Sequence, residues 1–116
     1  MKFVNLVVIT PSEHEDVIKD IAKDCGADGA TIIQGRGSSS GAKKSFFSLT
    51  FEGNQTIIKY VLEEKLSKKV LKAINKLILS NEISCVAFTM PISHIVGLDR
   101  EVLKKFEDTI KKEDDL

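Results

Sequence analysis

The chain has 116 residues, of which 42% are hydrophobic and 29% are charged, as in an ordinary globular domain. Its 17 basic and 17 acidic residues cancel, which argues against a nucleic-acid binder, because such a protein needs a basic face for phosphates. The apolar run near the start is too short for a membrane span or a signal segment, so we expect a cytoplasmic protein. Cys25 and Cys85 fit this expectation as small buried apolar residues.

The first part of the chain predicts a strand, a helix and a second strand. Residues Phe3 to Thr10 are rich in Val, Ile and Leu, as in a buried strand. Ser12 occupies the position of a helix N-cap, Glu15 completes a capping box, and Gly26 is placed to end the helix. The β-rich run from Ala30 to Gln34 then predicts the second strand.

The second part predicts two further strands, a helix and a last strand. Residues 45–51 alternate between apolar and polar side chains, which is the period of a half-buried strand. A strand over 56–64 follows, and Ser67 is placed to cap a helix that runs to about Ser80. The last strand is predicted over 83–90, with an extension over 92–96.

The predicted order is βαββαβ followed by a short C-terminal helix. This is the α+β, ferredoxin-like plan, in which two helices cover one face of an antiparallel sheet. We expect one domain over residues 1–98 and a charged helix and tail over 99–116, with Leu103, Phe106 and Ile110 on one side of that helix. Apolar residues occupy both faces of several strands, so the uncovered face of the sheet predicts an oligomer.

A glycine- and serine-rich stretch follows the second strand and is the clearest candidate for a binding loop. Glycines at 35, 37 and 41 surround serines at 38, 39 and 40, and such a loop brings backbone N–H groups and hydroxyls close to a ligand. Arg36, Lys43 and Lys44 add positive charge on both sides. The alternative is a plain flexible connection, because glycine and serine also form linkers.

Other polar and aromatic residues have two interpretations each. Phe46 and Phe47 are neighbours and face opposite ways on a strand, so one is a partner anchor or both belong to core and oligomer packing. His94 follows the last strand and either contacts a ligand or makes a structural hydrogen bond. His14 begins an acidic helix and is expected to be solvated. No spacing indicates a catalytic triad, a catalytic carboxylate pair, a phosphate-binding P-loop or a metal site.

With these elements placed, the chain resembles the PII family of nitrogen-regulatory signalling proteins from Lys2 to about Gly97. The residues that carry the resemblance are Gly29-Ala-Thr31 on the second strand, Gly35-Arg-Gly37 after it, and the segment that begins at Pro91 and ends at Val96. The resemblance implies a homotrimer with its sheets around a central axis and with ligand clefts between subunits.

Members of that family bind ATP or ADP, often with 2-oxoglutarate and magnesium, and dock onto partners through a long T-loop. For this chain the resemblance implies a non-enzymatic sensor that binds ATP, ADP, AMP or another nucleotide and regulates a membrane transporter or a metabolic enzyme through residues 38–55. The ligand residues that it implies or that lie near the expected cleft are Gly35, Arg36, Gly37, Ser38, Ser39, His94 and Arg100, and the partner residues are Ser40, Lys43, Lys44, Phe46 and Phe47.

The sequence departs from the family where phosphates are held. Asn81-Glu-Ile-Ser-Cys85 stands in place of a Gly-Asp-Gly-Lys loop, and Arg100 is the nearest arginine where typical members place two. These losses remove charge-assisted hydrogen bonds to phosphate, so the resemblance is to a divergent member. A second class with the same architecture is a trimeric metal-ion-binding protein of the CutA group, although the two cysteines and two histidines are spread apart.

Overall fold

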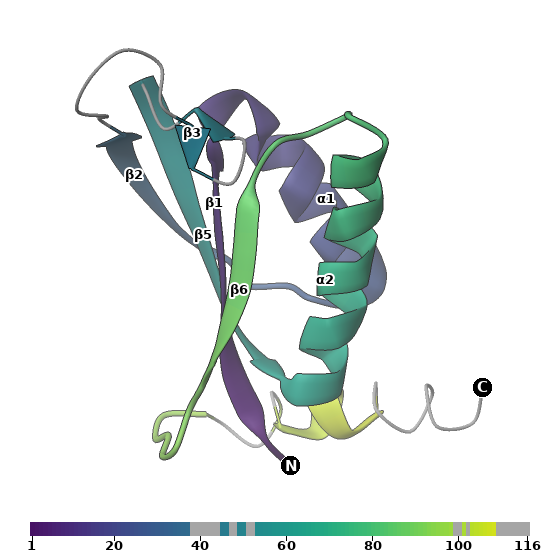
Figure 1. Ribbon diagram of the computed structural model, residues 1–116. Coiled ribbons are helices and arrows are strands. Elements are labelled where there is room, and N and C mark those ends of the chain that lie inside the picture. The colour runs from purple at the N-terminus through teal and green to yellow at the C-terminus, as the bar shows by residue number, and fades with distance from the viewer. Residues whose placement is uncertain (38–44, 47–48, 51–52, 99–100, 102, 109–116) are drawn as a thin grey trace.

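The computed structural model describes residues 1–37, 45–46, 49–50, 53–98, 101 and 103–108. Four strands form a sheet in the order β2-β5-β1-β6, and all neighbouring strands are antiparallel. Both helices lie on one side of this sheet (Figure 1). In chain order the elements are β1 (Phe3–Pro11), a 3₁₀ turn η1 (Ser12–His14), α1 (Glu15–Cys25), β2 (Thr31–Gly37), β3 (Ser45–Phe46), β4 (Leu49–Thr50), β5 (Gly53–Glu63), α2 (Glu64–Leu79) and β6 (Val86–Pro91).

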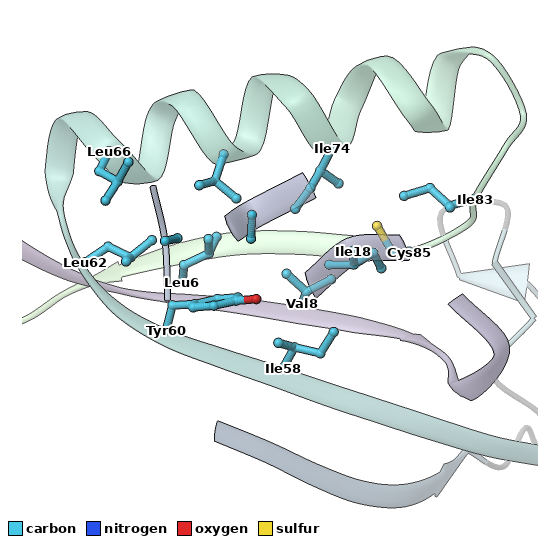
Figure 2. Close-up of a cluster of buried hydrophobic side chains, with 13 residues drawn as sticks. Leu6, Val8, Ile18, Ile58, Tyr60, Leu62, Leu66, Ile74, Ile83 and Cys85 are labelled. Carbon is cyan, nitrogen blue, oxygen red and sulfur yellow. The ribbon is translucent and has the colours of Figure 1, made fainter. Parts of the chain in front are cut away.

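The hydrophobic core lies between the helices and the sheet. Strand alternation determines which residues enter it, because every second side chain of β1 and β5 points to the helices. The register pairs Leu6 with Tyr60 and Val8 with Ile58, and all four side chains are buried. Figure 2 shows these residues beneath α2, with α1 contributing Ile18. The predicted α+β, ferredoxin-like fold is therefore confirmed.

Helix α1 ends where the sequence predicts but begins differently. Gly26 adopts the left-handed conformation at φ 108°, and its N–H donates to the carbonyl oxygen of Lys23 at 2.9 Å. The predicted Ser12 cap is wrong, because a 3₁₀ turn precedes the helix and Glu15 is its first residue. The Ser12 hydroxyl is instead within 3.0 Å of the Thr56 hydroxyl on the sheet.

The start of α2 also differs from the prediction, which placed Ser67 as the cap. Strand β5 runs directly into the helix, so its last residue, Glu63, becomes the N-cap. One carboxylate oxygen of Glu63 accepts hydrogen bonds from the N–H groups of Lys65 at 2.8 Å and Leu66 at 3.2 Å. Ser67 lies within the first turn, where its hydroxyl donates to the carbonyl oxygen of Glu64 at 2.6 Å.

Two predicted strands are shorter or divided. The strand expected over 45–51 is wrong, because β3 pairs antiparallel with β4 and the two cannot form one strand. The last strand begins at Val86 and ends at Pro91, where its pairing with β1 ends. The flanking segments predicted as strand, 83–85 and 92–96, lie outside β6. Before the strand, the Thr10 hydroxyl donates to the carbonyl oxygen of Ser84 at 2.9 Å.

The C-terminal part is helical over residues 103–108, as predicted for part of its length. The ring of Phe106 packs edge-to-face on Phe3 with a centroid distance of 5.6 Å, whereas Ile110 lies outside the described residues. The division into 1–98 and 99–116 stays a prediction. No helix in the described part of the chain has the length and apolar character needed to cross a membrane.

The sheet face opposite the helices exposes several large apolar side chains. Register places Val7 of β1 beside Phe88 of β6 on this face, and Phe88 is 39% exposed. Ile33 of β2, Val61 of β5 and Met90 of β6 are exposed on the same face. Exposed apolar side chains on a sheet face that no helix covers are typical of a surface that packs on another protein chain.

Candidate functional site

The candidate binding stretch Gly35–Gly37 is part of strand β2, so its prediction as the start of a loop is wrong. Its three residues pair with Gln55, Asn54 and Gly53 of β5, which extends the ladder by three residues at this end. The predicted T-loop over 38–55 is correspondingly too long, because 53–55 belong to β5. Since β2 is an edge strand, its outer backbone groups face no other strand among the described residues.

Gly35 leaves open space beside the backbone of β2. A Cβ added at Gly35 would meet no heavy atom within 4 Å, and the residue lies in extended strand conformation. The fold of the single chain therefore does not require glycine at this position. A glycine that the fold does not need is compatible with close approach of a ligand to the backbone.

A polar network fastens this end of β2 to the start of α1. The Gln34 side-chain amide donates to a carboxylate oxygen of Glu15 at 3.2 Å, and its carbonyl oxygen lies 3.2 Å from the Thr56 hydroxyl. The Lys19 ammonium lies 3.1 Å from Glu15 and holds the pKa of that carboxyl below its ordinary value. The residue before Gly35 is thus held to both β5 and α1, which fixes the position of the glycine stretch.

The chain does not bring His94 beside Gly35–Gly37. The glycine stretch lies at the end of the sheet where β1 ends, since both pair with β5 around Gln55. His94 follows β6, whose last residue, Pro91, pairs with Val4 near the start of β1. The exposed His94 therefore lies beyond the opposite end of the sheet.

The remaining predicted site residues lie largely outside the described part of the chain. Phe46 forms part of β3, where it pairs with Leu49. Arg36 is exposed on β2. The residues outside the described ranges are Ser38, Ser39, Ser40, Lys43, Lys44, Phe47 and Arg100.

Sequence reasoning missed a pocket at the other end of β2. The pocket has a volume of about 490 Å³ and combines hydrogen-bonding groups with apolar and aromatic side chains. We call it the β2–β5 pocket. The Gly29-Ala-Thr31 pattern was the signal that could have located it, because Gly29 and Thr31 lie in its wall. Its wall includes Asp28, Thr31, Lys59, Tyr60, Val61 and Phe106.

Tyr60 lies between this pocket and a second one of about 370 Å³ against α1, and it lines both. Burial, and secondarily the negative charge of Asp28, raises the pKa of Tyr60 to about 12. The phenol is therefore neutral at physiological pH and can serve as a hydrogen-bond donor. Asp28 and Gly29 also line both pockets, and Gly29 adopts φ 79°, a conformation that favours glycine.

The described residues offer binding groups rather than a reactive centre. Burial raises the pKa of the Cys85 thiol to about 11, so it is protonated and unreactive at neutral pH. Neither Cys25 nor Cys85 is in a disulfide. His14 is half-buried, and its Nδ1 accepts a hydrogen bond from the N–H of Ser84 at 3.3 Å, so the expectation of a solvated side chain is wrong. Across the described ranges, no three His, Cys, Asp or Glu side chains gather as metal ligands do.

Sequence comparison relates the chain to one family. Residues 1–101 match the family described as nitrogen regulatory protein P-II. No curated protein sequence matches the chain. The match supports the PII resemblance seen in the sequence and not the CutA-like alternative.

Comparison with solved structures gives the same fold. A PII-like protein, CPII of Thiomonas intermedia K12 bound to ADP, AMP and acetate, is 22% identical with a TM-score of 0.62, over 90% of this chain and 94% of CPII. Another structure of CPII, bound to ADP, AMP and bicarbonate, is 20% identical with a TM-score of 0.58, over 84% of this chain and 98% of CPII. A PII-like protein from Thermus thermophilus is 17% identical with a TM-score of 0.61, over 79% of this chain and 88% of that one.

Proposed function

This chain belongs to the nitrogen regulatory protein P-II family, and we propose that it is a non-enzymatic sensor of an adenine nucleotide that regulates a membrane transporter or a metabolic enzyme. The observation that carries the proposal is the geometry of the edge strand β2. One end presents the open backbone at Gly35, and the other end lines a pocket of ligand size. CPII, which shares the fold, is bound to ADP and AMP.

The site is completed between subunits of a homotrimer. Two observations support this part of the proposal. The apolar sheet face that contains Val61 and Phe88 needs a partner surface, and packing against further copies of the chain would bury it. In addition, His94 and Gly35 lie at opposite ends of the sheet, so only a neighbouring subunit can bring a His94 side chain to the glycine stretch.

The partner is engaged by residues 38–52, which connect β2 to β5. In our proposal Ser38 and Ser39 contact the ligand together with Gly35, Arg36, Gly37, His94 and Arg100. Ligand binding at the glycine stretch shifts the conformational population of the connection, which then docks onto the partner. The partner contacts that we propose are Ser40, Lys43, Lys44, Phe46 and Phe47. The cytoplasm is the expected location, since a reducing compartment suits two cysteines outside any disulfide.

A thermal-shift screen tests the proposed ligand class. Purified full-length protein is heated with ATP, ADP, AMP, cyclic dinucleotides or 2-oxoglutarate, each with and without magnesium. A nucleotide present at about 100 times its dissociation constant stabilises the folded state by about 2.7 kcal/mol, which is a shift of several degrees. We expect such a shift with ADP or AMP. If every nucleotide leaves the midpoint unchanged, the protein is not a nucleotide sensor.

A further inference from the structure

The outer surface of helix α2 is strongly basic. Five lysines of this helix are exposed, and its one acidic residue is Glu64 at its start. The lysines are Lys65, Lys68, Lys69, Lys72 and Lys76. Their spacing of three or four residues places them in one row, on the side of α2 opposite the buried Val70 and Ile74. We call this row the lysine stripe.

The outer surface of helix α1 carries the opposite charge. Asp16, Asp20 and Asp24 are exposed and four residues apart, so they form an acidic stripe on the side of α1 opposite the buried Ile18 and Ala22. The two lysines of α1 lie on its flank towards β2, where both line the pocket of about 370 Å³. The acidic and lysine stripes therefore run along neighbouring helices that share one side of the sheet (Figure 1).

The separation of charges between the helices points to an interaction surface. Like charges three or four residues apart repel each other and destabilise a helix, whereas a surface that needs only solubility mixes both signs. Oppositely charged stripes packed on these two would replace the repulsion by attraction. The 17 basic and 17 acidic residues of the whole chain cancel, so no long-range repulsion keeps copies of the protein apart.

Two exposed apolar side chains lie at one end of the helix layer. Val17, in the first turn of α1, is 44% exposed, and Leu79, the last residue of α2, is 74% exposed. Strands β1 and β5 are antiparallel and each leads into one of the helices, so α1 begins beside the end of α2. A surface that packs on the helix layer would cover both apolar side chains together.

We propose that the helix layer binds the helix layer of a second copy of the chain. A two-fold axis parallel to the helices places α1 of each copy over α2 of the other, so each acidic stripe meets a lysine stripe in a self-complementary contact. The same rotation brings Val17 of each copy to the Leu79 end of the other. An anionic membrane fits this surface less well, because the acidic stripe would face it too. The contact lies on the side of the sheet away from Phe88 and goes beyond the proposed function, on which it does not depend.

Salt-dependent self-association of the full-length protein tests the proposal. Analytical ultracentrifugation compares ionic strengths of about 0.01 M and about 1 M, at which the Debye length is about 30 Å and about 3 Å. A two-fold contact joins two copies, so we expect the weight-average mass to be at least about twofold higher at the lower ionic strength.

Variants with reversed charges show whether the two stripes meet. The α2 variant carries Lys69→Glu, Lys72→Glu and Lys76→Glu. The α1 variant carries Asp16→Lys, Asp20→Lys and Asp24→Lys. Each should lose the salt-dependent association, because like charges then meet across the contact. A chain with all six substitutions keeps the original net charge and exchanges the two stripes, so it should associate again.

A control variant changes the net charge away from the helix layer. Glu101→Lys, Glu107→Lys and Asp108→Lys are substitutions of exposed residues in the C-terminal part, and together they shift the net charge as much as the α1 variant does. This control should associate as the unchanged protein does. Circular dichroism establishes that every variant is folded, and the salt dependence of the unchanged protein tests the proposal even if a variant is not.

Four results would overturn the proposal. The first is a mass of the unchanged protein that does not depend on ionic strength. The second is a folded six-substitution chain that fails to associate, or a control that loses association. The third is a lower thermal midpoint of the triple variants at unchanged association, which would show that the stripes attract each other within one chain. The fourth is binding to phosphatidylglycerol vesicles without self-association, which would assign the lysine stripe to a membrane surface.

Discussion

Replacement of Gly35 by valine tests whether glycine at this position is required for stability or for ligand binding. A Cβ at Gly35 meets no heavy atom within 4 Å, and the residue lies inside β2, opposite Gln55. The single chain therefore has room for a larger side chain. If a nucleotide approaches the backbone here, valine occupies the space that the ligand needs.

The expected effects on stability and on binding have opposite signs. Glycine inside a strand lowers the stability of the folded protein by about 0.5–1 kcal/mol relative to alanine. β-Branched residues such as valine are more favourable in strands than alanine. For a domain of this size, Gly35→Val should therefore raise the thermal midpoint by about 2–6 °C. The same variant should weaken ADP binding by at least about tenfold, because a lost contact of about 1.4 kcal/mol corresponds to that factor.

The assay is a thermal melt and an ADP titration of the same preparation, with a glycine of opposite character as control. Gly29 also has open space, but its φ of 79° is unfavourable for other residues. Gly29→Ala should therefore lower the free energy of unfolding by about 1 kcal/mol or more, whereas Gly35→Ala should not lower it. A lower midpoint for Gly35→Val would refute the geometric reasoning. A stable variant with unchanged ADP affinity would remove Gly35 from the site.

Three further predictions concern the helix cap, the buried phenol and the apolar sheet face. In urea unfolding, Glu63→Ala should lower the free energy of unfolding by about 1–2 kcal/mol, because it removes the cap of α2. Glu63→Gln keeps a hydrogen-bond acceptor and should lower the free energy of unfolding less. Because the pKa of Tyr60 is raised from 10.0 to about 12, its contribution to stability is present below pH 10.0 and is lost as the pH rises towards 12. Tyr60→Phe should remove that pH dependence. If the free energy of unfolding has the same slope against pH in both proteins, this prediction is contradicted. In analytical ultracentrifugation Phe88→Asp should dissociate the proposed trimer, whereas Leu79→Asp, on the 74% exposed end of α2, should not. Trimers of the Phe88 variant would show that this face is not the interface.

Local patterns in the sequence predicted the elements whose structure is decided locally. The strand predicted over 56–64 corresponds to most of β5, in which Ile58, Tyr60 and Leu62 are buried. Gly26 ended α1 as predicted, because a left-handed residue is needed at that point. The caps at Ser12 and Ser67 were wrong, since the residue that caps α2 is determined by where β5 ends, and Glu63 is that residue.

The site was less predictable because distant residues decide it. Glycine and serine at 35–41 favour a loop, but Gly35–Gly37 become a strand through pairing with 53–55, far along the chain. The β2–β5 pocket draws its walls from Asn5 to Phe106, so no local pattern could reveal it. Register also separated His94 from the glycine stretch, which sequence order alone could not show.

Titration calorimetry of ADP into the purified full-length protein tests the central claim most directly. The proposed function predicts saturable binding with one ADP per chain, since a trimer has as many clefts as chains. It also predicts weaker binding by Gly35→Val at undiminished thermal stability. Absence of binding to the folded protein, or equal affinity of Gly35→Val, would contradict a nucleotide site along β2.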